Sequence, residues 1–171
     1  MPAYELQLKA TLGHVTALCP EDAQTFRWEV VPRCGSCGEV SDKALWICAS
    51  EQDEIPGGRG VANVIGKCKV CDRQYSVSVL NDKLQPYNIE DSGTFKTIVA
   101  FECRGIELHR YSPTGAWQCK GWVEGSEENG GEDKLTGTTF SDVDLGDEWA
   151  DYDENSDESV EIMEIEAKFS P

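Results

Sequence analysis

The chain has 171 residues, of which 32 are Asp or Glu and 15 are Lys or Arg, so its formal net charge at pH 7 is −17. This length fits one domain, or two small halves packed together, and it allows a sizeable hydrophobic core. So negative a chain repels phosphate backbones, which disfavours RNA or DNA as a partner.

In chain order, the sequence predicts strands nearly throughout. From Tyr4 to Leu12 apolar and polar residues alternate strictly, as in a half-buried strand, and Gly13 ends the pattern. Later candidates are each bounded by Gly, Pro, Asn or Asp, and they are residues 26–31, 45–49, 61–65, 75–80, 94–103, 116–123 and 160–169. In the last of these, Ile162 is out of phase with Met163, so we expect a β-bulge or burial on both faces there.

Helical patterns are weak everywhere. No window of eleven or more residues carries the apolar stripe of an amphipathic helix. We therefore predict an all-β fold, a sandwich or a barrel-like body.

Two Cys-x-x-Cys pairs are the strongest functional signal. Four thiolates on two tight turns complete a tetrahedral site for one zinc ion. The expected metal ligands are Cys34, Cys37, Cys68 and Cys71. Gly38 after the first pair and Asp72 after the second both tolerate the left-handed backbone that such turns need. Because the protein fills all four positions, we expect a closed structural centre rather than a catalytic one.

Other uses of the pairs remain open. Iron, including an iron–sulfur cluster, and Cu(I) also accept thiolate ligands. A redox dithiol is a further alternative, but it favours a pair at the start of a helix, and neither pair leads into a helical pattern.

The four remaining cysteines fall singly and are expected to be small buried side chains. They are Cys19, Cys48, Cys103 and Cys119. The N-terminus lacks a signal-peptide pattern, and no apolar stretch approaches the length of a membrane span. We expect free thiols, no membrane association, and a location in the reducing cytoplasm, with the nucleus as a second possibility.

The negative charge is concentrated in the second part of the chain. Residues 1–85 hold nine basic and eleven acidic residues, whereas residues 86–171 hold six basic and twenty-one acidic ones. Between Glu124 and Glu166, seventeen acidic residues accompany Lys134 alone. The segment from Gly125 to Leu135 is polar and rich in glycine, so we expect a mobile surface loop.

A faint internal repeat suggests two similar halves within one zinc-binding domain, 1–171. The halves are residues 1–85, which carry the zinc cysteines, and residues 90–171, which are acidic and carry none. The matched positions are Leu8, Ala10, Leu12 and Val15 with Val99, Phe101, Cys103 and Ile106, and Ser41–Leu45 with Ser141–Leu145.

Motifs along nearly the whole chain resemble one known family. They include Cys34-Gly-Ser-Cys37-Gly38-Glu39-Val40-Ser41-Asp42-Lys43, Lys67-Cys68-Lys69-Val70-Cys71, Pro86-Tyr87-Asn88, Phe101-Glu102-Cys103-Arg104-Gly105 and Trp149-Ala150-Asp151-Tyr152-Asp153-Glu154. The chain is similar to the eukaryotic CXXC motif-containing zinc-binding proteins. This resemblance implies a β-rich body of two similar halves, with zinc held by the four cysteines of the first half. It implies no enzymatic activity.

Three other motifs are weaker. Asp151-x-Asp153-x-Asn155 begins like a calcium loop, but Ser156 and Ile162 stand where the glycine and the bidentate glutamate belong. The stretch Gly57–Gly60 lacks the lysine and hydroxyl of a phosphate loop. His14 and His109 have no nucleophile in a recognisable motif.

Two functions from different classes fit these observations. The first is a non-catalytic zinc protein that acts as an adaptor, expected to be a monomer that binds another protein through its acidic half or the rim of the zinc turns. The second is a thiol-redox or metal-transfer protein whose cysteines react, which needs an exposed thiolate or an open coordination position.

Overall fold

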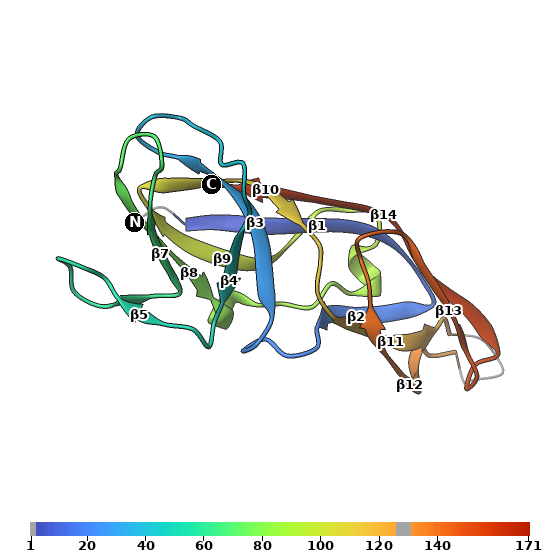
Figure 1. The fold of residues 1–171 in the computed structure, drawn as a ribbon. Helices are drawn as coiled ribbons and strands as arrows, with labels where there is room; N and C mark the ends of the chain where they lie inside the picture. Colours follow the sequence, from blue (N-terminus) through green and yellow to red (C-terminus); the bar gives the residue numbers. More distant parts are fainter. Residues whose placement is uncertain (1–2, 126–130) are drawn as a thin grey trace.

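The computed structural model describes residues 3–125 and 131–171, and these residues form antiparallel strands with two single-turn 3-10 helices (Figure 1). The strands are β1 (Ala3–Gly13), β2 (Val15–Pro20), β3 (Arg27–Cys34), β4 (Leu45–Cys48), β5 (Asp53–Glu54), β6 (Val61–Ala62), β7 (Val64–Lys67), β8 (Gln74–Leu80), β9 (Lys96–Arg104), β10 (Ile106–Ser112), β11 (Trp117–Val123), β12 (Lys134–Val143), β13 (Trp149–Asp153) and β14 (Glu158–Ser170). The helices are η1 (Asn81–Lys83) and η2 (Ile89–Asp91). The prediction of an all-β protein is confirmed.

One large curled sheet organises the molecule. It has six strands in the order β13-β14-β1-β9-β8-β7. Two three-stranded sheets, β10-β3-β4 and β12-β11-β2, and the β5-β6 ribbon complete the described fold. None of the described helices is long and apolar enough to cross a membrane.

The two parts of the chain are interlocked. β1 pairs with β9 at the centre of the large sheet, and each then gains a second neighbour from the opposite part, β14 beside β1 and β8 beside β9. β2 joins the sheet of β11 and β12, whereas β10 joins the sheet of β3 and β4. The strands of residues 1–85 therefore alternate in space with those of residues 90–171, and we infer that neither half folds alone.

A turn with a left-handed residue precedes each of the two strands, β2 and β10, that join a sheet of the other half. Between β1 and β2, His14 has φ 57°, and between β9 and β10, Gly105 has φ 74°. The matched apolar positions from Leu8 to Val15 and from Val99 to Ile106 are all buried on these strands. By contrast, Ser41–Leu45 leads into β4, whose first residue is Leu45, whereas Ser141–Leu145 begins in the last three residues of β12 and runs past its end. This second sequence match therefore does not relate equivalent positions.

Aromatic side chains fill the core between the sheets. Trp28 on β3 and Trp117 on β11 are fully buried, and their ring centroids lie 6.1 Å apart in an edge-to-face arrangement. Phe26 contacts both rings, and Phe101 on β9 packs against Trp28 at 5.8 Å. Because β3 and β11 belong to different halves, these contacts join the halves directly.

The predicted strands agree with the structure except at sheet edges. The bulge expected near Ile162 lies on β14 between Met163 and Glu166, where Glu164 has φ 51°. β2, β10, β12 and β13, which the sequence did not reveal, are all edge strands. Of the predicted loop from Gly125 to Leu135, residues 126–130 lie outside the described residues, and Lys134 and Leu135 already belong to β12.

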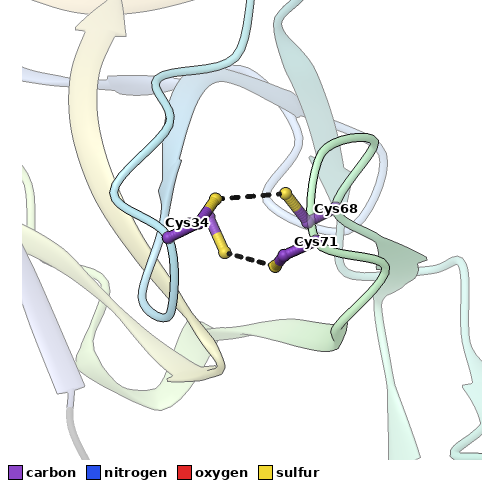
Figure 2. A group of neighbouring side chains, drawn as sticks. Cys34, Cys68 and Cys71 are labelled. Atoms are coloured by element: carbon purple, nitrogen blue, oxygen red, sulfur yellow. Dashed lines mark hydrogen bonds between the residues drawn. The ribbon is translucent and has the colours of Figure 1, made fainter.

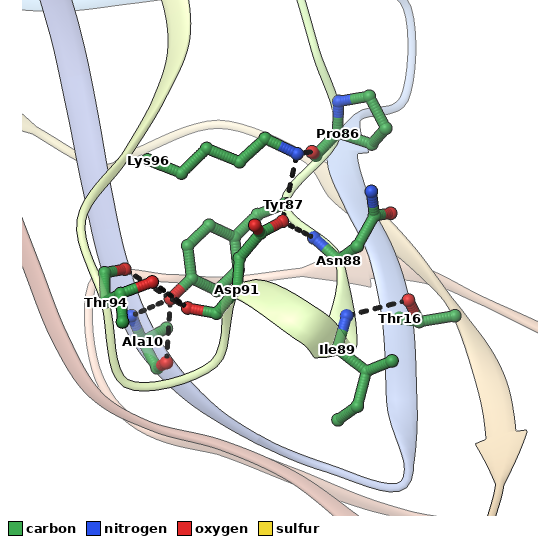
Figure 3. A network of polar contacts seen from close by, with 9 residues as sticks. All are labelled: Ala10, Thr16, Pro86, Tyr87, Asn88, Ile89, Asp91, Thr94 and Lys96. Carbon is green, nitrogen blue, oxygen red and sulfur yellow. Dashed lines mark hydrogen bonds and ion pairs between the residues drawn. The ribbon is translucent and has the colours of Figure 1, made fainter.

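A buried tyrosine fastens the connection between β8 and β9 to the central sheet (Figure 3). The Tyr87 hydroxyl accepts a hydrogen bond from Ala10 N–H at 3.2 Å and lies within donating distance of the carbonyls of Asp91 and Thr94. The Tyr87 backbone also exchanges two hydrogen bonds of 2.8 Å with Leu18 of β2. The motif Pro86-Tyr87-Asn88 thus ties the middle of the chain to its first two strands.

We predict that Tyr87→Phe lowers the free energy of unfolding by about 1 to 3 kcal/mol, because it leaves buried backbone groups without their partner. Tyr152→Phe removes a hydroxyl from a side chain that is 47% exposed and should change stability by less than about 0.5 kcal/mol. Denaturant unfolding of both variants measures the difference. Equal stabilities would contradict a structural role for the Tyr87 hydroxyl.

Candidate metal centre

The first cysteine turn follows directly from β3, whose last residue is Cys34. The Cys34 N–H donates to the Glu39 carbonyl at 2.9 Å, and the Gly38 N–H donates back to the Cys34 carbonyl at 3.0 Å. Gly38 has φ 77°, a conformation that glycine adopts without steric cost. The sequence Cys-Gly-Ser-Cys-Gly therefore folds into a tight turn that presents both sulfurs on one side.

The second cysteine turn joins β7 to β8 and has the same hydrogen-bond pattern. The Cys68 N–H donates to the Arg73 carbonyl, and the Asp72 N–H donates to the Cys68 carbonyl, both at 2.9 Å. Asp72 has φ 61° and stands where Gly38 stands in the first turn. The prediction that Asp72 takes the left-handed backbone is confirmed.

The two turns bring all four predicted ligands together (Figure 2). The four sulfur atoms lie within 4.8 Å of one another. Cys34 and Cys71 are 3.6 Å apart, and so are Cys37 and Cys68. A zinc ion at about 2.3 Å from each sulfur requires sulfur–sulfur separations of about 3.8 Å, so the spacing suits tetrahedral coordination.

Backbone N–H groups point at the sulfurs from inside each turn. Ser36 N–H donates to the Cys34 sulfur and Val70 N–H to the Cys68 sulfur, both at 3.4 Å. The N–H groups of Cys37 and Ser36 lower the pKa of Cys34 to about 6, and the N–H groups of Cys71 and Val70 lower the pKa of Cys68. The peptide groups thus stabilise the thiolates of Cys34 and Cys68, the form that binds metal. Desolvation and the neighbouring thiols raise the pKa of Cys37 to about 12 and also raise that of Cys71.

These residues fit a zinc ion. Cys34, Cys37, Cys68 and Cys71 can supply four soft, negatively charged sulfur ligands, which is a donor set that zinc prefers. Bound zinc would supply a rigid tetrahedral link between the β3–β4 and β7–β8 connections. The protein's own contribution is to direct backbone dipoles at the sulfurs and to form the hydrogen bonds within both turns.

The other four cysteines lie apart from this cluster. Cys48, Cys103 and Cys119 are buried, and Cys19 is half-buried. Burial raises the pKa of both Cys103 and Cys119 to about 12. Cys103 and Cys119 therefore stay protonated and pack as small apolar groups, as the sequence indicated.

In the second half, a carboxylate occupies the place that corresponds to Cys68. Asp153 begins the β13–β14 turn as Cys68 begins the β7–β8 turn, and Asp157 N–H donates to its carbonyl at 2.8 Å. Asp157 has φ 60°, close to the value of Asp72. The two turns are thus alike in backbone and differ in the side chain that begins them.

The Asp153 side chain is fully buried and hydrogen-bonded rather than placed for a metal. Its oxygens accept hydrogen bonds from Thr136 and Thr138 of β12 at 2.5 and 2.6 Å, and from Asn155 N–H at 3.0 Å. Burial alone raises the pKa of this carboxyl, but the hydrogen bonds outweigh burial and hold the pKa below its usual value. Gly121 on β11 leaves room for this side chain, because a Cβ at position 121 would overlap the carboxylate.

Sequence reasoning treated Asp153 only as part of a weak calcium pattern. In the structure its carboxylate is satisfied by hydroxyl and amide donors, and it anchors the β13–β14 turn to β12. The alternating Thr136-x-Thr138 pair, which places two hydroxyls on one face of a strand, was the available signal.

The fold and the cysteine cluster together define an all-β protein with four cysteines placed so that they could hold a metal ion. The family "CXXC motif containing zinc binding protein, eukaryotic" matches residues 5–170, and the chain belongs to this family. The family is named for zinc binding and not for a catalytic activity.

Relatives of similar length support this assignment. A CXXC motif containing zinc binding protein from Xenopus laevis is 43% identical over 171 residues, which cover 99% of each chain. The protein of that name from Homo sapiens is 43% identical over 165 residues, which cover 96% of this chain and 95% of the relative.

Solved structures show the same fold. The crystal structure of C1orf123 superposes with a TM-score of 0.84 at 40% identity and covers 99% of both chains. A hypothetical protein from Plasmodium falciparum superposes with a TM-score of 0.81 over 99% of this chain and all of that chain. At 23% identity, the second likeness shows the fold alone.

We predict that Cys37→Ser or Cys71→Ser lowers zinc content and melting temperature together. Structural zinc contributes about 10 to 16 kcal/mol of apparent binding free energy, which is comparable to the stability of a whole domain. Cys19→Ser, which changes a cysteine outside the cluster, should keep about one zinc per chain. Metal analysis and thermal unfolding test this, and an unchanged melting temperature after complete removal of zinc would refute it.

We predict that Asp153→Asn destabilises the protein by about 1 to 3 kcal/mol at pH 7, because it replaces a buried, hydrogen-bonded carboxylate with an amide. Because folding lowers the pKa of Asp153, its contribution is complete above the unfolded value of about 3.9 and is lost as the pH falls through the folded pKa. The deficit of the variant should therefore shrink below about pH 4.

Asp151→Asn is the matched control for this change, since Asp151 is exposed on the same strand and loses the same charge. Its effect should stay below about 0.5 kcal/mol. Denaturant unfolding from pH 7 to pH 3 gives both curves. A deficit for Asp153→Asn that does not depend on pH would show that the charge of the carboxylate is irrelevant.

Proposed function

We propose that this protein is a non-catalytic adaptor, in which a zinc ion fixes a surface that binds another protein. The observation that carries the proposal is the closed ligand set, since Cys34, Cys37, Cys68 and Cys71 together fill every position of a tetrahedral ion. A catalytic zinc centre keeps one position for water or substrate.

The histidines support a role without catalysis. His14 lies in the turn between β1 and β2, with Nε2 3.8 Å from the Glu158 carboxylate, and His109 is exposed on β10. Among the described residues, no hydrogen bond joins either imidazole to a serine, threonine or cysteine. A nucleophile paired with a base, the usual sign of covalent catalysis, is therefore not formed by either histidine in the described part of the chain.

Two ends of the molecule offer surfaces to a partner. The cysteine turns lie at the end of the fold that carries β7, and β12 and β13 lie at the opposite end (Figure 1). The acidic residues of β12 to β14 would attract a basic protein surface over about one Debye length, close to 10 Å at 0.1 M salt, and they also favour solubility. We place the adaptor, as a monomer, in the cytoplasm or the nucleus, where thiols stay reduced.

A second function, metal transfer, is favoured by one feature of the site. Cys37 and Cys71 are exposed, so an incoming thiolate can approach the ligand cluster from solvent. A transfer protein would exchange its zinc with an acceptor by stepwise replacement of sulfur ligands, whereas an adaptor would keep it.

Affinity capture with metal analysis distinguishes the two functions. The zinc-loaded protein and a zinc-depleted Cys37→Ser/Cys71→Ser variant serve as immobilised baits in native extract, with Cys19→Ser as the control bait. We expect a stoichiometric protein partner on the two zinc-loaded baits, with about one zinc per chain still on the bait. Movement of zinc to the captured protein would show transfer, and the absence of a stoichiometric partner would refute the adaptor.

A further inference from the structure

A cavity opens beside the candidate metal centre. Its volume is about 480 Å³, which is within the range of pockets that hold ligands. One wall is the connection from Glu39 to Leu45, and the other is the second cysteine turn from Lys67 to Val70. Its lining also includes Pro32, Tyr75 and Ile106, so the cavity offers apolar surface to an occupant.

Both walls are held in place. On the first wall, Val40 pairs with Arg33 of β3, and Ser41 N–H donates to the Pro32 carbonyl at 2.9 Å. On the second wall, Cys68 supplies a metal ligand, and Cys34 of the first turn also lines the cavity. Zinc bound by Cys34 and Cys68 would therefore brace both walls of the cavity.

Exposed apolar side chains stand at the cavity, one on each wall. Val40 is 41% exposed and Val70 is 66% exposed, and both line the cavity. Apolar surface that is open to water on both sides of an apolar hollow favours burial against a partner.

Three lysines lie around the same cavity without ion-pair partners. Lys43, Lys67 and Lys69 line it, and among the described residues none of them has a carboxylate within 4.0 Å. Glu39 and Asp42 also line it, but they do not neutralise these ammonium groups directly. In a chain with 32 acidic and 15 basic residues, these three lysines form a local group of positive charge.

We propose that this cavity is the partner site of the adaptor, and that it binds a short peptide segment with a large apolar anchor flanked by acidic residues. The proposal rests on the adaptor function. The anchor would fill the hollow between Val40 and Val70, and carboxylates of the segment would contact Lys43, Lys67 and Lys69. Selectivity comes from these individual contacts, since the overall charge of −17 repels acidic chains at long range.

Selection from a random peptide library displayed on phage tests the proposal without a known partner. The zinc-loaded protein is the target, and Lys67→Glu/Lys69→Glu serves for counter-selection. We expect enriched peptides that combine Leu, Phe or Trp with Asp or Glu. Their affinity, measured by fluorescence anisotropy, should fall about tenfold for Lys67→Glu/Lys69→Glu and for Val70→Ser.

Matched variants control for charge, exposure and folding. Lys83→Glu/Lys120→Glu changes the net charge by the same amount at two exposed lysines elsewhere, and Val61→Ser changes another exposed valine. These controls should bind the selected peptides like the wild type. Zinc content and melting temperature of every variant are measured alongside, so that a loss of binding is not confused with a loss of the metal centre.

Each remaining outcome overturns the inference. Enrichment of basic peptides that bind the cavity variants normally would place the partner site on the acidic end and leave the adaptor function intact. No enrichment over the counter-selected variant would show that the cavity binds no peptide segment. The adaptor function itself is judged separately by affinity capture, which does not depend on where the partner binds.

Discussion

The antiparallel pairing of β1 with β9 is the interaction on which the rest of the fold depends. It places the first strand of each half side by side, as in the pair Tyr4 and Phe101, and it directs the following strand of each half into a sheet of the other. The aromatic core, the cysteine turns and the Asp153 turn all take their positions from this arrangement. Stability is therefore shared between the halves rather than summed over two separate cores.

The two ends of the large sheet stabilise similar turns by different chemistry. At one end, four thiolates can share a metal ion, whose binding free energy is comparable to that of folding itself. At the other, the carboxylate of Asp153 accepts short hydrogen bonds from Thr136 and Thr138, each of which contributes far less. The end with the cysteine turns would thus be stabilised by an ion from outside the polypeptide. The end with Asp153 is stabilised by hydrogen bonds within the polypeptide.

The features that the sequence predicted correctly are those that depend on the spacing of residues close together in the chain. The central strand β1 alternates cleanly because one of its faces is buried, and the Cys-x-x-Cys spacing alone indicates a metal turn. The edge strands β12 and β13 were not predicted because most of their side chains are exposed. β2 and β10 were not predicted because each breaks its own alternation, β2 at Ala17 with φ 56° and β10 between Leu108 and Arg110. The role of Asp153 was not predicted because its partners on β12 become adjacent only after the sheets have formed, and its charge does not distinguish it from the sixteen other acidic residues between Glu124 and Glu166.

The pairing of β1 with β14 has a consequence for how the chain folds during synthesis. Glu5 lies opposite Ser170, so the large sheet cannot close until the last strand has left the ribosome. Contacts between residues so distant in sequence form slowly, and β1 leaves an unpaired edge in the meantime. All four candidate zinc ligands emerge within the first 71 residues. A metal ion bound at that stage would order the cysteine turns early, and would shorten the time during which the nascent chain can aggregate.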